Sequence, residues 1–124
     1  MTLPSGNLFA QLPPLEPSQP EWFQTLLSGQ GWQLERILSA GHRSEAGFWY
    51  DQPQGEFVLL LQGEARLRIE QEAEARTLGP GDWLYLPAGC RHRVEWTSPT
   101  QPTLWLALHL APEAALPVTP NNIE

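Results

Sequence analysis

The chain has 124 residues, of which seven are arginine and fourteen are acidic, and its formal net charge at neutral pH is −7. Apolar residues make up 41%, and 13 prolines and 10 glycines are present, which excludes a disordered chain, a coiled coil and a helical bundle. Because the negative charge repels phosphate backbones and anionic lipid headgroups, we expect neither a nucleic-acid partner nor a membrane partner.

The cysteine content and the first residues bear on the cellular compartment. The chain has one cysteine, Cys90, so no internal disulfide can form and nothing indicates an oxidising compartment. The first six residues show neither the basic nor the apolar segment of a secretory signal. No stretch approaches the roughly 18 apolar residues of a membrane-spanning helix. We therefore expect a cytoplasmic protein.

Residues 1–31 are predicted to form an N-terminal arm and a short helix that pack on the rest of the domain. Prolines among the first nineteen residues favour an extended arm. Three apolar side chains suggest that this arm lies on the domain or on a neighbouring subunit: Leu8, Phe9 and Leu12. The helix is predicted to begin at Pro20 and to end at Gly29. Four apolar side chains lie on one helical face: Trp22, Phe23, Leu26 and Leu27.

From Trp32 onward the apolar pattern changes to the alternation of β-strands. Strands are predicted at 32–38, 48–51, 56–61, 64–70, 76–78, 83–86, 91–96 and 103–110. Short strands separated by frequent turn signals, with no helices between them, indicate an antiparallel β-sandwich or a small barrel. Residues 111–124 contain three prolines and are predicted to form a C-terminal tail, which leaves residues 32–110 as the barrel.

Four residues between positions 81 and 92 have a spacing that suggests a turn, a strand and a reversal. Gly81 allows a tight turn into a strand and Pro87 ends that strand. Gly89 then lets the chain reverse in a conformation with positive φ. The strand that follows directs the His92 imidazole toward the interior.

This spacing resembles the second sequence motif of the cupins, and Glu56 and Gly63 have the spacing of the first motif. The two histidine positions of the first motif fall on Tyr50 and Gln52. The resemblance covers about residues 32–110 and implies an all-β fold, the antiparallel double-stranded β-helix or jelly-roll barrel, with the predicted N-terminal helix packed outside. It also implies a homodimer, to which the apolar arm residues would contribute.

The resemblance further implies a divalent metal inside the barrel. The counterparts of the cupin ligands here are Tyr50, Gln52, Glu56 and His92. Gln52, Glu56 and His92 are the candidate ligands for Fe²⁺, Mn²⁺, Ni²⁺ or Zn²⁺. Tyrosine, with an ordinary pKa near 10, and neutral glutamine are weak ligands compared with the imidazoles they replace.

The residues leave a metal-free interpretation open. Glu56 can hydrogen-bond to His92 and close a polar network in an apolar core. Tyr50, Gln52, Glu56 and His92 would then bind a small polar molecule directly. A barrel with only a structural or dimerising role is the third interpretation.

The functional hypothesis is a barrel that binds a small polar or carboxylate-bearing molecule, with Glu56 as acid or base and His92 as its partner. Tyr50, Gln52 and Trp49 are the candidate substrate-binding residues, and Arg91 is a candidate anchor for a carboxylate. Similar proteins include isomerases, oxygenases and decarboxylases, and the sequence does not choose among them. The alternative is a non-catalytic module without metal that binds an effector and acts through a partner protein.

A few other side chains are weaker candidates. His42 lies in a predicted loop, and His109 lies on a strand whose leucines occupy the opposite face, so His109 faces either the interior or the outside. Cys90 is next to Arg91, a setting that can lower the pKa of a thiol. Four tryptophans fall on predicted strands and are expected mostly in the core or at a subunit interface: Trp49, Trp83, Trp96 and Trp105.

Overall fold

The computed structural model describes residues 2–114, which form eight β-strands and one turn of 3₁₀-helix, Pro112–Ala114. The strands are β1 (Trp22–Gly29), β2 (Trp32–Ser39), β3 (Gly55–Gln62), β4 (Ala65–Ile69), β5 (Arg76–Leu78), β6 (Trp83–Leu86), β7 (His92–Thr97) and β8 (Thr103–Leu110). Within residues 2–114 all strand pairs are antiparallel. The predicted all-β jelly-roll fold is confirmed.

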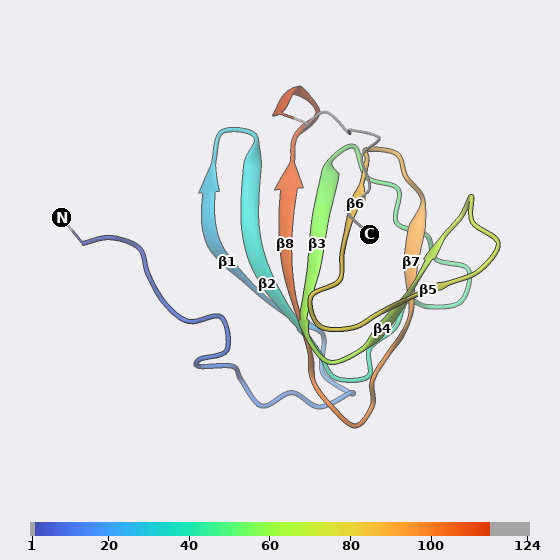
Figure 1. Ribbon diagram of the computed structural model, residues 1–124, viewed down its shortest axis with the longest axis horizontal. Coiled ribbons are helices and arrows are strands. Elements are labelled where there is room, and N and C mark those ends of the chain that lie inside the picture. Colours follow the sequence, from blue (N-terminus) through green and yellow to red (C-terminus); the bar gives the residue numbers. More distant parts are fainter. Residues whose placement is uncertain (1, 115–124) are drawn as a thin grey trace.

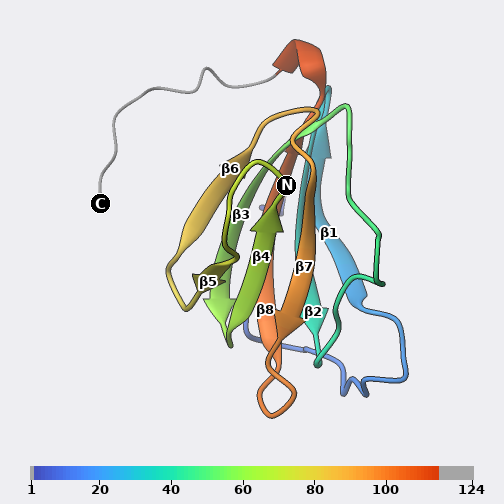
Figure 2. The same ribbon diagram turned by 90° about the vertical axis from the view of Figure 1, so that its right-hand side faces the viewer.

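The strands form two facing sheets, in the orders β1-β2-β8-β3-β6 and β5-β4-β7. Figure 1 shows β1, β2, β8 and β3 side by side, with β4, β5 and β7 on the other side of the barrel, and Figure 2 shows this smaller sheet from the front. The last strand, β8, lies between β2 and β3, so it joins segments far apart in sequence. As a result, side chains from the start, middle and end of the chain meet in one interior.

The predicted N-terminal helix is absent, and its residues form the edge strand β1. Strand β1 pairs with β2 from Trp22 opposite Leu38 to Gly29 opposite Trp32. The two-residue connection contains Gly31 with a φ of 77°, a conformation suited to a tight hairpin. A helix this short is marginal by itself, whereas pairing with β2 satisfies the backbone along the whole segment. The Gly29-Gln30-Gly31 sequence is therefore a hairpin signal and not a helix end.

The predicted strand at 48–51 is also wrong in extent. Only one isolated bridge forms there, between Tyr50 and His92. Glycine and proline flank the segment, so it remains a connection that crosses to the smaller sheet at one point.

The N-terminal arm is fixed to the outer face of the larger sheet, because the Arg36 guanidinium donates to the carbonyls of Leu8 and Ala10 at 2.8 and 2.9 Å.

The apolar core fills one end of the barrel. It consists of buried side chains from both sheets: Val58, Leu60, Ala65, Leu67, Leu78, Trp105 and Ala107. Along β3 the inward residues run from Leu60 through Val58 to Glu56, and along β8 they run from Trp105 through Ala107 to His109. The interior thus changes from apolar to polar along the same two strands. Within residues 2–114, no helix has the length and apolar character needed to cross a membrane.

Candidate active site in the barrel interior

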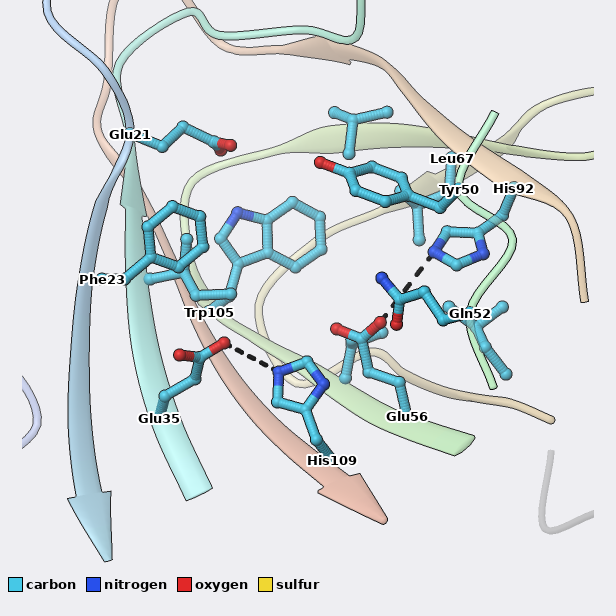
Figure 3. A pocket seen from close by; sticks show the side chains of 14 residues that line it. Glu21, Phe23, Glu35, Tyr50, Gln52, Glu56, Leu67, His92, Trp105 and His109 are labelled. Carbon is cyan, nitrogen blue, oxygen red and sulfur yellow. Dashed lines mark hydrogen bonds and ion pairs between the residues drawn. The ribbon is translucent and has the colours of Figure 1, made fainter. Parts of the chain in front are cut away.

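A cavity of about 270 Å³ occupies the polar end of the barrel (Figure 3). Its wall combines polar side chains with apolar and aromatic ones, as in sites for small molecules. The lining residues are Glu21, Phe23, Glu35, Ile37, Tyr50, Gln52, Glu56, Val58, Leu67, Leu86, His92, Val94, Trp105 and His109. Four of the six residues predicted to form the site, namely Tyr50, Gln52, Glu56 and His92, are among them.

Glu56 and His92 come from opposite sheets and meet at the cavity. Glu56 is on β3, with 9% of its surface exposed, and His92 begins β7, with 7% exposed. The His92 Nε2 atom lies 3.9 Å from the Glu56 Oε1 atom. At this separation the two groups are near neighbours without a direct hydrogen bond, so a ligand atom can contact both.

The turn before β7 fixes the orientation of the His92 ring. Gly89 has a φ of 77°, as its predicted role in the chain reversal requires, and its N–H donates to the Gln52 carbonyl at 2.8 Å. The His92 Nδ1 atom lies 2.9 Å from the carbonyl oxygen of Cys90, which can only accept. Nδ1 therefore carries the proton of the neutral ring, and Nε2 presents its lone pair to the cavity.

Tyr50 covers the His92 ring from the connection before β3. Its backbone exchanges two hydrogen bonds with that of His92, and the two rings stack with centroids 5.3 Å apart. Burial raises the pKa of the Tyr50 phenol above its ordinary value, and the charges of Glu21 and Glu56 raise it further. The phenol therefore stays protonated at neutral pH and serves as a hydrogen-bond donor toward the cavity.

A second acid–imidazole pair forms the opposite side of the cavity. His109 Nε2 lies 2.7 Å from Glu35 Oε1, which joins β8 to β2 (Figure 3). The sequence left the direction of His109 open and missed Glu35. The alternation of side chains along the two strands could have revealed both residues. Glu35 lies on the same strand face as Ile37 and Ser39, and His109 lies on the same face as Trp105 and Ala107. The leucines of β8 lie on the other face.

A third carboxyl group, Glu21, lies at the other end of the cavity. The Ser39 hydroxyl donates to Glu21, and the Trp105 indole N–H donates to the Ser39 oxygen at 3.2 Å. Glu21 directly precedes β1. Because this segment was predicted to be a helix outside the barrel, the sequence did not identify Glu21 as a cavity residue. The cavity therefore contains three glutamates, and no arginine is among its lining residues.

Trp49 and Arg91, the other two predicted binding residues, are not among the residues that line the cavity. The Arg91 and Arg93 guanidinium groups each lie 5.9 Å from the Trp49 ring centre. Arg91 also lies 3.0 Å from the Glu70 carboxylate. The alternation of β7 explains this placement, because His92 faces inward and its two arginine neighbours face outward.

The weaker candidates from the sequence, His42, Cys90 and the strand tryptophans, are not all part of the cavity. The His42 ring contacts the Ala40 N–H and the Gln19 carbonyl, so it braces a loop outside the cavity. Burial raises the pKa of the Cys90 thiol, and the Glu72 charge adds to the effect, which is opposite to the lowering considered from the sequence. Of the four strand tryptophans, Trp105 is buried, whereas Trp83 remains 49% exposed.

The charge of the cavity depends on Glu56. Burial raises the pKa of the Glu56 carboxyl group above its ordinary value. The nearby imidazoles of His109 and His92 oppose this increase, and Glu35 reinforces it. Glu56 is therefore a group that holds a proton at higher pH than an exposed glutamate does, which is a common property of acid–base residues.

The donor set does not fit a tightly bound divalent metal. Across residues 2–114, no group of three or more histidine, cysteine or acidic side chains is arranged to hold one ion. Tyr50 retains its proton, Gln52 contributes only a neutral amide, and the Glu35 carboxylate is already at hydrogen-bonding distance from His109. Glu56 and His92 are the remaining donors of the predicted set, and among the described residues His109 does not form a metal-holding group with them.

Comparison with known families identifies the fold family. A family model described as the cupin domain matches residues 37–109. The chain belongs to the cupin family. A solved cupin-like structure, that of a putative mannose-6-phosphate isomerase from Ralstonia eutropha, is 48% identical, with 86% of this chain and 97% of that chain covered and a TM-score of 0.81.

More distant structures share the cupin fold. A cupin superfamily protein from Desulfitobacterium hafniense is 20% identical, with 90% and 94% of the two chains covered and a TM-score of 0.69. A protein with a double-stranded β-helix domain from Klebsiella pneumoniae is 13% identical, with coverages of 92% and 95% and a TM-score of 0.71. No curated protein matches this cupin chain.

Proposed function

We propose that this cupin binds a small, uncharged polar molecule in its barrel and transfers protons to and from it, with Glu56 as the acid–base group. The observation that carries the proposal is the meeting of Glu56 and His92, from opposite sheets, at a cavity of about 270 Å³. A cavity of this size suits a metabolite and excludes a polymer.

The charges at the cavity favour an uncharged ligand over the carboxylate-bearing one expected from the sequence. Three glutamates line the wall, and neither arginine nor lysine is among the lining residues described. Sites for carboxylate or phosphate normally present guanidinium or ammonium groups. For the same reason we do not propose a sugar phosphate, the kind of substrate named for the Ralstonia protein, as the ligand of this chain. Its phosphate group would meet no cationic side chain in this cavity.

The mechanism follows from the protonation of the two groups. His92 Nε2 faces the cavity as a hydrogen-bond acceptor, because the Cys90 carbonyl holds the ring proton on Nδ1. Glu56 in its neutral form is a donor, and once it has given its proton it becomes a base. The Tyr50 phenol and the Gln52 amide orient the polar groups of the ligand, and Phe23 and Trp105 provide an aromatic part of the wall.

Thermal denaturation with a ligand panel tests binding. The panel contains mannose, xylose, glyceraldehyde and dihydroxyacetone as neutral compounds, and mannose 6-phosphate, citrate and acetate as anions. We expect stabilisation by a neutral compound, and a ligand at 100 times its Kd contributes about 2.7 kcal/mol. The stabilisation should disappear in Glu56→Gln and His92→Ala and persist in Arg91→Gln. Stabilisation by anions alone would contradict the proposal, and no response to any compound would favour the accessory-module alternative.

Metal analysis tests whether the site holds a metal, which its donor set does not favour. We expect the purified wild-type protein, Glu56→Gln and His92→Ala to contain the same trace amounts of Fe, Mn, Ni and Zn. A stoichiometric metal in the wild-type protein that is lost in both variants would contradict the proposal. It would restore the ligand set that the cupin resemblance implied.

A further inference from the structure

Two carboxyl groups and two imidazoles alternate across the cavity, from one sheet to the other. Their order is Glu35 on β2, His109 on β8, Glu56 on β3 and His92 on β7. His109 is directly opposite Glu56 in the β3–β8 register, so the two side chains are neighbours on the inner face. Figure 3 shows the His109 ring between the Glu35 and Glu56 carboxyl groups.

The hydrogen bonds at the two ends fix which ring nitrogens are free. The Glu35 carboxylate accepts from His109 Nε2, so the neutral His109 ring carries its proton there. His109 Nδ1 is then an unprotonated nitrogen, and it is buried with no hydrogen-bond partner among the described residues. His92 presents Nε2 as its unprotonated nitrogen. Both residues line the cavity, each ring has one unprotonated nitrogen, and Glu56 lies between them in the order of the strands.

We propose that His109 is a second acid–base group of this pocket, that Glu35 is its positioning residue, and that the pocket therefore moves a proton between two atoms of one bound molecule. This inference rests on the proposed function and extends it from single proton transfer to isomerisation. An unpartnered buried nitrogen is costly unless a ligand or a neighbouring donor satisfies it, and Glu56 is the acid–base residue directly opposite His109 in the strand register.

The proton and electron balance requires no further reactant. His109 Nδ1 takes a proton from the ligand, and the electron pair of the broken bond stays on the ligand. Neutral Glu56 gives its proton to a second ligand atom, and the new imidazolium is held by the Glu35 carboxylate. The proton on His109 then passes to the Glu56 carboxylate opposite, which restores both groups. The ligand is isomerised without net oxidation or reduction.

The first test reads the histidine tautomers by ¹⁵N NMR of the histidine-labelled protein at neutral pH. We expect His109 protonated at Nε2 and His92 protonated at Nδ1. In Glu56→Gln the ¹⁵N signals of His109 Nδ1 and His92 Nε2 should both move, whereas those of His42, the remaining histidine, should not. A His109 ring protonated at Nδ1, or one that does not respond to Glu56→Gln, would overturn the inference.

The second test measures proton exchange with glyceraldehyde, dihydroxyacetone and mannose in D₂O, followed as deuterium uptake at the carbon beside the carbonyl. Uptake should fall about 100-fold or more in Glu56→Gln and His109→Gln. The amide that Glu56→Gln introduces can still donate a hydrogen bond, so a structural role of Glu56 would survive this change. Glu35→Gln should reduce uptake by about 10-fold and shift the His109 ¹⁵N signals, and His42→Gln should behave as wild type.

The outcomes separate this inference from the proposed function. If a neutral compound binds and exchanges at the wild-type rate in His109→Gln, the second acid–base role is wrong and the proposed function stands. If a compound binds but no compound in the panel exchanges even with wild-type protein, proton shifting is wrong and binding stands. If no compound binds, both proposals are wrong.

Discussion

At the scale of single residues, the chemistry of this cupin depends on how each polar side chain is held. His92 is oriented by a carbonyl two residues earlier, His109 by a carboxylate on the neighbouring strand, and Glu56 by neither. Burial raises the pKa of Glu56, because the nearby imidazoles of His109 and His92 offset only part of the desolvation of its ionised form. The cavity therefore combines two oriented bases with one carboxyl group that readily keeps its proton.

The raised pKa of Glu56 predicts a pH dependence of stability. The folded protein binds the Glu56 proton more tightly than the unfolded chain, whose pKa is near 4.5. The resulting stabilisation is complete below that pH and is lost as the pH rises through the folded-state pKa. Glu56→Gln lacks this dependence, so its stability relative to wild type should increase as the pH rises, by about 1.4 kcal/mol for each pKa unit between the two states.

Denaturant unfolding from about pH 4 to about pH 8 measures this difference. A free-energy difference that stays constant across the range would show that the folded-state pKa of Glu56 is not raised. Glu64 is an exposed glutamate before β4, and Glu64→Gln is the matched control. The difference in unfolding free energy between this variant and wild type should stay constant with pH.

At the scale of elements, the hairpin between β3 and β4 places Glu56 by fixing the other end of its strand. Gly63 connects the two strands with a φ of 95°. A Cβ atom on Gly63 would lie 2.6 Å from the Thr103 Cα atom and 2.8 Å from the Pro102 carbonyl oxygen. The backbone at the start of β8 therefore approaches Gly63 too closely for any other residue.

Gly63→Ala is predicted to destabilise the protein by about 3 kcal/mol or more, because positive φ and a backbone clash combine. Gly47→Ala is the matched control: Gly47 has a φ of 81° but no atom within 4 Å of its Cβ position. The control should lose only about 1–2 kcal/mol from the left-handed conformation. Urea unfolding measures both, and equal losses would show that the close approach to Thr103 is unimportant.

At the scale of the whole molecule, the outer face of the larger sheet is apolar across its central strands. Half-buried or exposed side chains without charge cover it: Leu34, Leu106, Leu108, Phe57, Leu59, Trp83 and Tyr85. The Trp83 ring stacks on Phe57 with centroids 5.4 Å apart and remains half exposed. An apolar face depleted of charge is typical of the centre of a subunit interface, and a sheet can pair with its own copy.

We therefore predict a homodimer that pairs these sheet faces, as the cupin resemblance suggested. Light scattering after size exclusion should give twice the mass of the chain. Trp83→Glu should shift the protein to monomer, because it buries a charge at the interface. Phe48→Glu, at a half-exposed aromatic residue in the loop before β3, should remain dimeric. A monomeric wild-type protein at all concentrations would contradict the prediction.

The sequence by itself determined the class of fold, the strands from β2 onward and the reversal that turns His92 inward. These depend on local rules: alternation over a few residues, and a glycine where φ is positive. Because Glu56 and His92 follow the same alternation, both were placed inside correctly. The helix predicted from Pro20 to Gly29 was wrong, because a short apolar segment fits either period until its pairing partner is known.

Only the tertiary structure decided which side chains face each other. Glu35, Glu21 and His109 come from segments as much as 88 positions apart, and they meet because β8 inserts between β2 and β3. No local pattern encodes that strand order, which results from closing two sheets over a common core. The charge of the cavity, and with it the kind of ligand it favours, is therefore a property of the assembled barrel and not of any one motif.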